Sequence, residues 1–134
     1  MGLIAQIAAL RDGTGRPQAL VGELRRTTLL VPVSDGGLMS AERGGVRWLY
    51  AFTDEVSLSR FLLQRGADPA AEAEYVAILG ARLLDAVIPS LDGPTGVAVN
   101  VADEDGSMLF PPVAGIVPDS VAVDLVGKGA RGER

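Results

Sequence analysis

Three carboxylates in the middle of the chain, Asp68, Glu72 and Glu74, are the side chains whose types and spacing come nearest to catalytic chemistry. Closely spaced carboxyl groups can act as general acid and base. These three stand where a loop meets the next element, and the chain holds no histidine to work with them. Charged groups in such a position are usually solvated, so we expect an exposed polar face rather than a catalytic set.

A second acidic segment, residues 103–106 (DEDG), invites comparison with a calcium-binding loop. An EF-hand loop needs oxygen ligands at positions 1 and 12 around a glycine at position 6. With Gly106 at position 6, those places hold Val101 and Pro112, which offer no side-chain oxygen. We therefore expect an exposed hairpin turn and no metal site.

The residue types missing from the sequence exclude whole classes of chemistry. Neither cysteine nor histidine occurs among the 134 residues, which removes thiol nucleophiles, disulfides, zinc ribbons and Ser–His–Asp catalysis. Residues 127–129 (GKG) and 12–15 (DGTG) match a phosphate loop and an aspartic-protease triplet only in part. We assign no catalytic, cofactor-binding or metal residue, and we expect a non-enzymatic protein without a cofactor.

The net charge and the hydropathy of the chain limit the classes of binding partner and the cellular locations that we expect. The net charge of −5 argues against nucleic acid and anionic membranes, which favour a basic face. The apolar stretch at the N-terminus is short and follows no basic residue, so we expect no secretory signal, no membrane segment and a cytoplasmic location. With 48% hydrophobic residues, the chain predicts a single domain over residues 1–126 and a flexible tail over 127–134.

The apolar spacing predicts helices and strands in the first half of the chain. A helix is expected over the first ten residues, and a second one begins at Pro17. Residues 27–33 predict a strand, placed at an edge or bulged because Pro32 lacks a donor. An alternating strand over 46–52 follows residues 34–45, which we expect to be a mobile loop joining an antiparallel pair.

The second half continues the alternation of helices and strands. A helical stripe predicts a helix over 54–64. Residues 70–90 fit one long helix or a strand over 74–79 followed by a helix over 81–88, and we favour the second. Further strands are expected over residues 97–101, 107–111 and 117–125. The order α-α-β-β-α-β-α-β-β-β predicts an α+β fold with a mixed sheet packed by helices.

Half of the six aromatic residues, Trp48, Tyr50 and Phe52, share one face of the strand over 46–52. Core packing is the ordinary role of such a stripe. The functional alternative is a surface that contacts an unknown protein partner or a second copy of the chain, because aromatic and arginine side chains anchor interfaces. The residues of that surface would be Arg47, Trp48, Tyr50, Phe110 and Pro111, with Pro112 at its rim.

Thr53, Asp54 and Glu55 stand between this strand and the following helical stripe. A hydroxyl or carboxylate there can accept from the free N–H groups of a helix start, and acidic groups suit its dipole. We expect Thr53 or Asp54 to cap the helix, and Thr53→Ala to cost about 1 kcal/mol without loss of binding.

Four segments occur in the order seen in one protein family: LLVPV, LYAFTDEVSLSRF, YVAILGARLLD and LFPPVAGIVPDSVAVD. Over roughly residues 15–124 the chain therefore resembles the SseB N-terminal-domain family. The resemblance implies a compact α+β domain, and the preference for arginine over lysine is similar to that of actinobacterial members. The family is associated with serine sensitivity and, by label, with type III secretion, and it implies no catalytic residue at any position.

Three hypotheses of function follow. The leading one is a non-enzymatic module that binds a protein partner or itself. The second is a secretion- or toxin-linked accessory, such as a chaperone or an immunity-type protein, which would neutralise a basic partner with acidic loops. The third is a carboxylate-dependent enzyme or small-ligand binder with a pocket near residues 34–45.

Overall fold

The computed structural model describes residues 2–125, which form both helices and strands. The strands are β1 (Thr28–Ser34), β2 (Gly37–Leu38), β3 (Ser40–Arg43), β4 (Val46–Ala51), β5 (Tyr75–Leu79), β6 (Thr95–Val99) and β7 (Met108–Phe110). The helices are α1 (Leu3–Arg11), α2 (Pro17–Arg26), α3 (Glu55–Gln64) and α4 (Gly80–Arg82), the last continuing into a π-helical turn (Leu83–Val87) and a 3-10 turn (Ile88–Ser90). Within the described residues no helix has the length and apolar character that crossing a bilayer demands.

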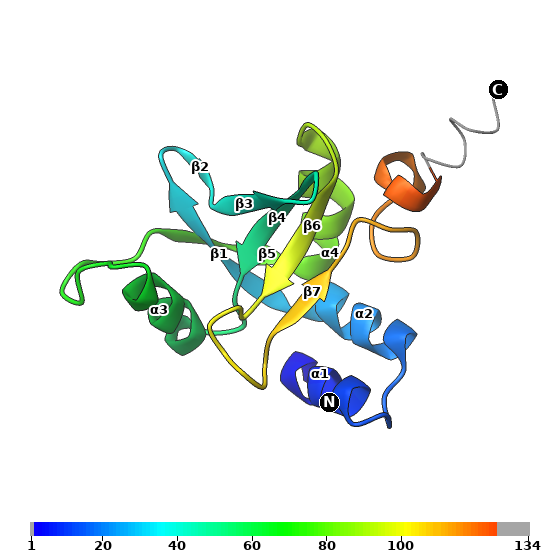
Figure 1. The fold of residues 1–134 in the computed structure, drawn as a ribbon, viewed down its shortest axis with the longest axis horizontal. Coiled ribbons are helices and arrows are strands. Elements are labelled where there is room, and N and C mark those ends of the chain that lie inside the picture. The colour runs from blue at the N-terminus through cyan, green and yellow to red at the C-terminus, as the bar shows by residue number, and fades with distance from the viewer. Residues whose placement is uncertain (1, 126–134) are drawn as a thin grey trace.

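Two sheets form the centre of the fold (Figure 1). One has the strand order β2-β1-β5, and the other has the order β3-β4-β6-β7. In the second sheet β4 and β6 run parallel, whereas β3 and β7 pair antiparallel with them. The expected α+β fold with a mixed sheet is therefore confirmed.

Two hydrophobic clusters lie on opposite faces of these sheets. The larger cluster joins α1, α2 and the helical segment after β5 to the sheets. The smaller cluster consists of Phe52, Leu58 and Phe61 and lies beneath α3. Strand β4 and the residue after it contribute to both, since Leu49 and Ala51 face the larger cluster while Phe52 faces the smaller one.

Residues 34–45 are not the mobile loop that we expected, because they form β2, β3 and two tight turns. Asp35 and Gly36 have φ of 53° and 79°, and Gly44 and Gly45 have φ of 62° and 80°. Positive φ at both central residues is what a two-residue type I′ hairpin turn requires. The glycines therefore close the β1–β2 and β3–β4 hairpins instead of loosening the chain.

Strand β1 is central rather than at an edge, which corrects the expectation drawn from Pro32. The N–H groups of Leu30 and Phe52 donate to each other's carbonyls at 2.8 and 2.9 Å. The Pro32 nitrogen points to this same side of β1. There the Met39 carbonyl, which would have accepted from residue 32, accepts from the Tyr50 N–H at 3.1 Å. Pro32 therefore lacks its N–H at the point where the chain between β2 and β3 stops pairing with β1 and begins to pair with β4.

Residues 70–90 hold a strand and then a helical segment, so the alternative of one long helix is wrong. Strand β5 pairs antiparallel with β1, and Ala77 stands opposite Leu30. At Gly80, the first helical residue, a Cβ would lie 1.8 Å from the carbonyl oxygen of Leu24. Only glycine allows this helix start to approach α2 so closely.

The strand expected over residues 117–125 is also wrong. Pro118 begins a 3-10 turn over Asp119–Val121, and the proline and the turn prevent a regular ladder. The Val123 N–H then donates to the Pro112 carbonyl at 2.8 Å, so the segment folds back on the chain. The larger cluster extends as far as Ala122. The tail predicted over 127–134 lies outside the described residues.

Candidate functional site

One face of the four-stranded sheet is only partly covered. Alternation along β4 places Trp48 and Tyr50 on the side opposite to the larger cluster. Their neighbours in register are Gly96 and Ala98 on β6 and, beyond Ala98, Leu109 on β7. These five residues define what we call the open face.

The Trp48 indole rests on β6 because residue 96 has no side chain. A Cβ at Gly96 would lie 2.8 Å from the Trp48 ring and 2.6 Å from the Phe110 carbonyl oxygen. Any other residue would therefore displace the indole or the strand. Ala98 is only 3% exposed, whereas Trp48 and Tyr50 are half-buried. The open face thus has a floor of small residues with two aromatic rings beside it.

A pocket of about 320 Å³ lies over this floor. Its lining residues are Ala41, Glu42, Arg43, Trp48, Tyr50, Phe61, Ala98, Val101 and Leu109. Leu109 is 56% exposed and Val101 is 37% exposed, so large apolar side chains at the edge of the pocket contact water. An exposed apolar patch with aromatic residues at its centre is typical of surfaces that contact another protein.

Helix α3 covers the other end of the same face. The Phe61 ring centroid lies 4.6 Å from that of Tyr50 and 5.1 Å from that of Phe52. The Arg65 guanidinium, just after α3, lies 5.6 Å from the Tyr50 ring centroid and 5.2 Å from that of Phe61. These are cation–π distances, and they place Tyr50 at the boundary between the covered and the open part.

A polar junction holds the start of α3 against the sheet. Asn100 is fully buried at φ 50°; its Oδ1 accepts from the Thr53 N–H, and its Nδ2 donates to Thr53 Oγ1, both at 3.0 Å. Asp54 Oδ1 accepts from the Ser57 N–H at 2.8 Å. Of the two expected caps, Asp54 is therefore the one that caps α3, while Thr53 satisfies the buried amide.

The loop between β6 and β7 docks onto α1 and α3. The Asp103 carboxylate accepts from Ser57 Oγ at 2.8 Å and forms an ion pair with Arg60. Arg11 of α1 donates to the Glu104 carbonyl at 2.9 Å. The expected hairpin is confirmed, but Asp103 is not an exposed turn residue, because only 17% of its side chain is accessible. Within residues 2–125, acidic side chains nowhere form a group of three that could hold a metal ion.

The residues predicted as one interaction surface divide between two faces of the sheet. Trp48 and Tyr50 lie on the open face. Phe110 is 2% exposed within the larger cluster, so it cannot be part of a contact surface. Arg47 precedes Trp48 on β4 and therefore points to the opposite side, while Pro111 is exposed just after β7. A binding role for Trp48 and Tyr50 stays a prediction.

Leu109 and Ala98 are open-face residues that the sequence reasoning missed. Alternation over 97–101 did indicate that Ala98 and Val97 face opposite ways. Placing Leu109 beside Ala98, however, requires the register of β6 and β7, with Val97 opposite Phe110. That register depends on the length of the loop over residues 100–107, which no local pattern reveals.

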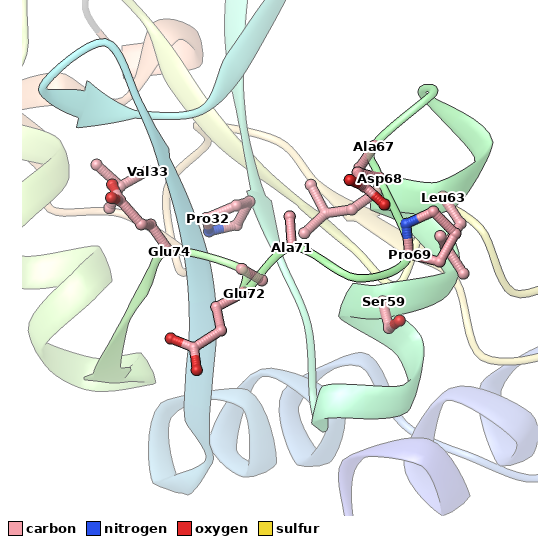
Figure 2. Close-up of a pocket in the computed structure, with 12 residues that line it drawn as sticks. Pro32, Val33, Ser59, Leu63, Ala67, Asp68, Pro69, Ala71, Glu72 and Glu74 are labelled. Carbon is pink, nitrogen blue, oxygen red and sulfur yellow. The ribbon is translucent and has the colours of Figure 1, made fainter.

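A second pocket, of about 330 Å³, lies between α3, β1 and residues 67–74 (Figure 2). It is bordered by Asp68, Glu72 and Glu74, all exposed as expected. Figure 2 shows the three carboxylates lying apart from one another. Asp68 Oδ1 accepts from the Ala70 N–H at 2.9 Å, which makes it a turn residue. The three side chains do not converge on one point where a substrate could be held.

Three ionisable side chains with shifted pKa values lie away from the open face. Hydrogen bonds from the threonine two residues further on lower the pKa of Asp12. Hydrogen bonds from Arg25, at 3.0 and 2.5 Å, lower the pKa of Asp85. A hydrogen bond to Glu55 raises the pKa of the Tyr75 phenol. The three groups stabilise a turn, the contact of α2 with the π-helical turn, and the contact of β5 with α3.

Comparison with known proteins agrees with the resemblance read from the sequence. A family model described as SseB protein N-terminal domain matches residues 3–113. Searches of curated proteins and of solved structures gave no match. The matched span includes all seven strands and the whole open face.

Proposed function

The chain belongs to the SseB N-terminal domain family, and from its open face we propose that it is a non-enzymatic, cytoplasmic protein-binding domain. The observation that carries this proposal is the aromatic pair, Trp48 and Tyr50, beside a floor of small residues and next to the exposed Leu109. A partner that covered this face would bury apolar surface that the chain alone leaves in water.

The chemistry of the face indicates what the partner presents. Burying one leucine-sized side chain contributes about 1.5–3 kcal/mol, so a few such contacts are enough for specific binding. Glu42 and Arg43 lie at the edge of the pocket, where interfaces carry their polar rim. The partner is therefore a protein segment with an apolar side chain at its centre and polar groups around it.

The same pocket supports a non-catalytic role. It borders residues 41–43, within the segment 34–45 near which the enzyme hypothesis placed a pocket, but its lining contains one carboxylate, Glu42. Carboxylate catalysis generally requires two groups whose surroundings separate their pKa values. The carboxylates of the second pocket lie apart, which gives the enzyme hypothesis no better position.

A secretion- or toxin-linked accessory that neutralises a basic partner would use other residues. Glu104 and Asp105 are exposed, whereas Asp103 is already paired with Arg60. Binding through such carboxylates would weaken strongly with added salt, because exposed charges are screened. Binding through the open face would persist, so salt dependence separates the two roles.

The test is a comparison of partner capture by three tagged forms of the protein in extract of its own host. Leu109→Asp places a charge on the open face, at the edge of its pocket, and Val56→Asp places the same charge on α3, where Val56 is 66% exposed. We expect a protein that the wild type and Val56→Asp retain and Leu109→Asp loses by at least about tenfold, since a buried unpaired charge is costly.

Trp48 gives an independent measurement because it is the only tryptophan of the chain. Purified partner should change its fluorescence emission and protect it from an external quencher. Thermal unfolding of the variants controls for loss of fold. Equal capture by Leu109→Asp and wild type, or a partner that leaves the Trp48 emission unchanged, would refute the open face as the binding surface.

A further inference from the structure

Strand β5 is the outer strand of the three-stranded sheet, and among residues 2–125 only β1 pairs with it. Two hydrogen bonds fix which of its backbone groups face β1. The Val33 N–H donates to the Glu74 carbonyl at 3.0 Å, and the Gly80 N–H donates to the Thr27 carbonyl at 2.7 Å. Even-numbered residues therefore bond to β1. The residues whose N–H and C=O point outward are Tyr75, Ala77 and Leu79.

This edge is exposed and apolar along its whole length. Tyr75, Val76 and Leu79 are 36%, 40% and 46% exposed. Residues 75–79 contain no charge, proline or glycine. Proteins usually protect an edge strand with such residues, because a free row of N–H and C=O groups is a template for another strand. The composition of β5 therefore favours pairing.

We propose that β5 pairs antiparallel with β5 of a second copy of this chain, about a two-fold axis at Ala77. Ala77 then faces Ala77 of the partner subunit, and Tyr75 faces Leu79 of the partner subunit. These are the residues with outward backbone groups, so each facing pair exchanges both of its hydrogen bonds. The two three-stranded sheets become one continuous sheet across the dimer.

The sequence of the edge is complementary to itself in this register. Besides the outward residues, Val76 faces Ile78 of the partner subunit, which makes every cross-strand pair apolar. Glu72 and Glu74 precede the strand, and Arg82 follows it. Antiparallel pairing brings the acidic end of one strand beside the basic end of the other, whereas a parallel arrangement would place like charges together. This complementarity identifies a second copy as the occupant.

The dimer should depend on concentration, because a contact built on five-residue strands is smaller than a standard interface. It uses β5, whereas the open face lies on β4, β6 and β7. Either surface can therefore be disabled without the other.

Opposite charges at residue 77 test both the strand and the register. We expect the wild type to form dimers at high concentration in sedimentation equilibrium, and Ala77→Lys and Ala77→Glu each to remain monomeric, since like charges would meet at the axis. An equimolar mixture of the two variants should recover the dimer. Ala77→Ser changes the same side chain without adding a charge, so it should dimerise as the wild type does. Circular dichroism confirms the fold of each variant.

A cysteine provides a second measurement in a chain that has none. Facing Cα atoms in a hydrogen-bonded antiparallel pair lie about 5.5 Å apart, within the range of a disulfide. Ala77→Cys should therefore form a covalent dimer on mild oxidation, and Ala5→Cys, exposed on α1, should not. A monomeric wild type at about millimolar concentration, dimers in both charge variants, or a mixture that stays monomeric would each overturn the proposal. So would recruitment of a foreign peptide to β5 without self-pairing.

Discussion

The two ends of the aromatic stripe along β4, formed by Trp48, Tyr50 and Phe52, differ in burial. Phe52 is fully buried beneath α3, whereas Trp48, four residues earlier on the same face, is half-buried beside a pocket. Both are large aromatic side chains in one alternating strand. The difference therefore comes from what lies above the sheet and not from the strand itself.

What lies above the sheet is positioned by polar contacts. Asn100 and Thr53 tie the end of β4 to the end of β6, and Asp54 caps α3 directly after them. Asp103 then holds Arg60 and Ser57 of that helix. The helix is fixed over Phe52 and ends near Tyr50, which leaves the Trp48 end uncovered. A structural end and a candidate binding end thus share one strand face.

The largest expected effect separates core packing from surface packing. Phe52→Ala should lower the free energy of unfolding by about 3–5 kcal/mol, because it empties a fully buried site. Trp48→Ala should cost less, since that side chain is only partly buried. Urea denaturation of both variants, analysed with a common slope, measures the difference.

Equal costs for the two substitutions would break the comparison. Trp48 would then be a core residue, and the open face would lose its claim to be a binding surface. Leu49→Ala serves as the internal reference, since Leu49 is buried on the other side of β4 in the larger cluster. Its cost should resemble that of Phe52→Ala.

The second effect tests whether the polar junction acts as a unit. Asn100→Ala and Thr53→Ala should each cost about 1–3 kcal/mol, because either one leaves a buried polar group without its partner. The double variant should cost less than the sum, by about 0.5–3 kcal/mol. Ser90→Ala, remote from the junction, is the control that should add to Asn100→Ala without coupling. Full additivity of Asn100 and Thr53 would mean that their hydrogen bonds do not hold α3.

The sequence predicts the covered end better than the open end. The change from alternation to helical spacing at Thr53 and Asp54 is local, and helix α3 begins where that pattern places it. The role of Thr53 is not local, since its partner Asn100 is distant in the chain. A capping rule therefore identifies the junction and includes Asp54 as a cap, but it does not identify the partner of Thr53.

The open face depends on pairing between strands, which local patterns do not contain. The turns Asp35-Gly36 and Gly44-Gly45 carry the standard hairpin signal. The prediction of a loop over residues 34–45 treats their glycines as a sign of mobility and therefore omits β2 and β3. Without β3 the neighbours of Trp48 could not be assigned. The prediction groups Phe110 with Trp48 on one surface for a related reason, since the sequence does not give the register of β6 and β7, in which Phe110 faces Val97. Alternation decides the face only once the partner strand is known.

The smallest expected effect is the stability contribution of an ordinary surface ion pair, with which the costs at the two ends of the aromatic stripe can be compared. Arg25 of α2 and Asp85 of the π-helical turn form two hydrogen bonds, which lower the pKa of Asp85 below its usual value. A lowered pKa in the folded state contributes stability above the unfolded value, near 3.9, and this stability is lost as the pH falls through the folded value. The side chains are 38% and 48% exposed, so the contribution should stay below about 1 kcal/mol.

Asp85→Asn and Arg25→Gln should each remove the same small part of the acid dependence, which urea denaturation between pH 2 and pH 6 would measure. The junction substitutions should leave that part in place, because they do not touch Asp85. An acid dependence that Asp85→Asn leaves unaltered would show that this pair is not formed in solution. A loss several times larger than about 1 kcal/mol would instead show that the pair is as structural as the junction at Asn100. The polar junction that fixes α3 and the surface ion pair of Arg25 and Asp85 would then contribute similarly to stability.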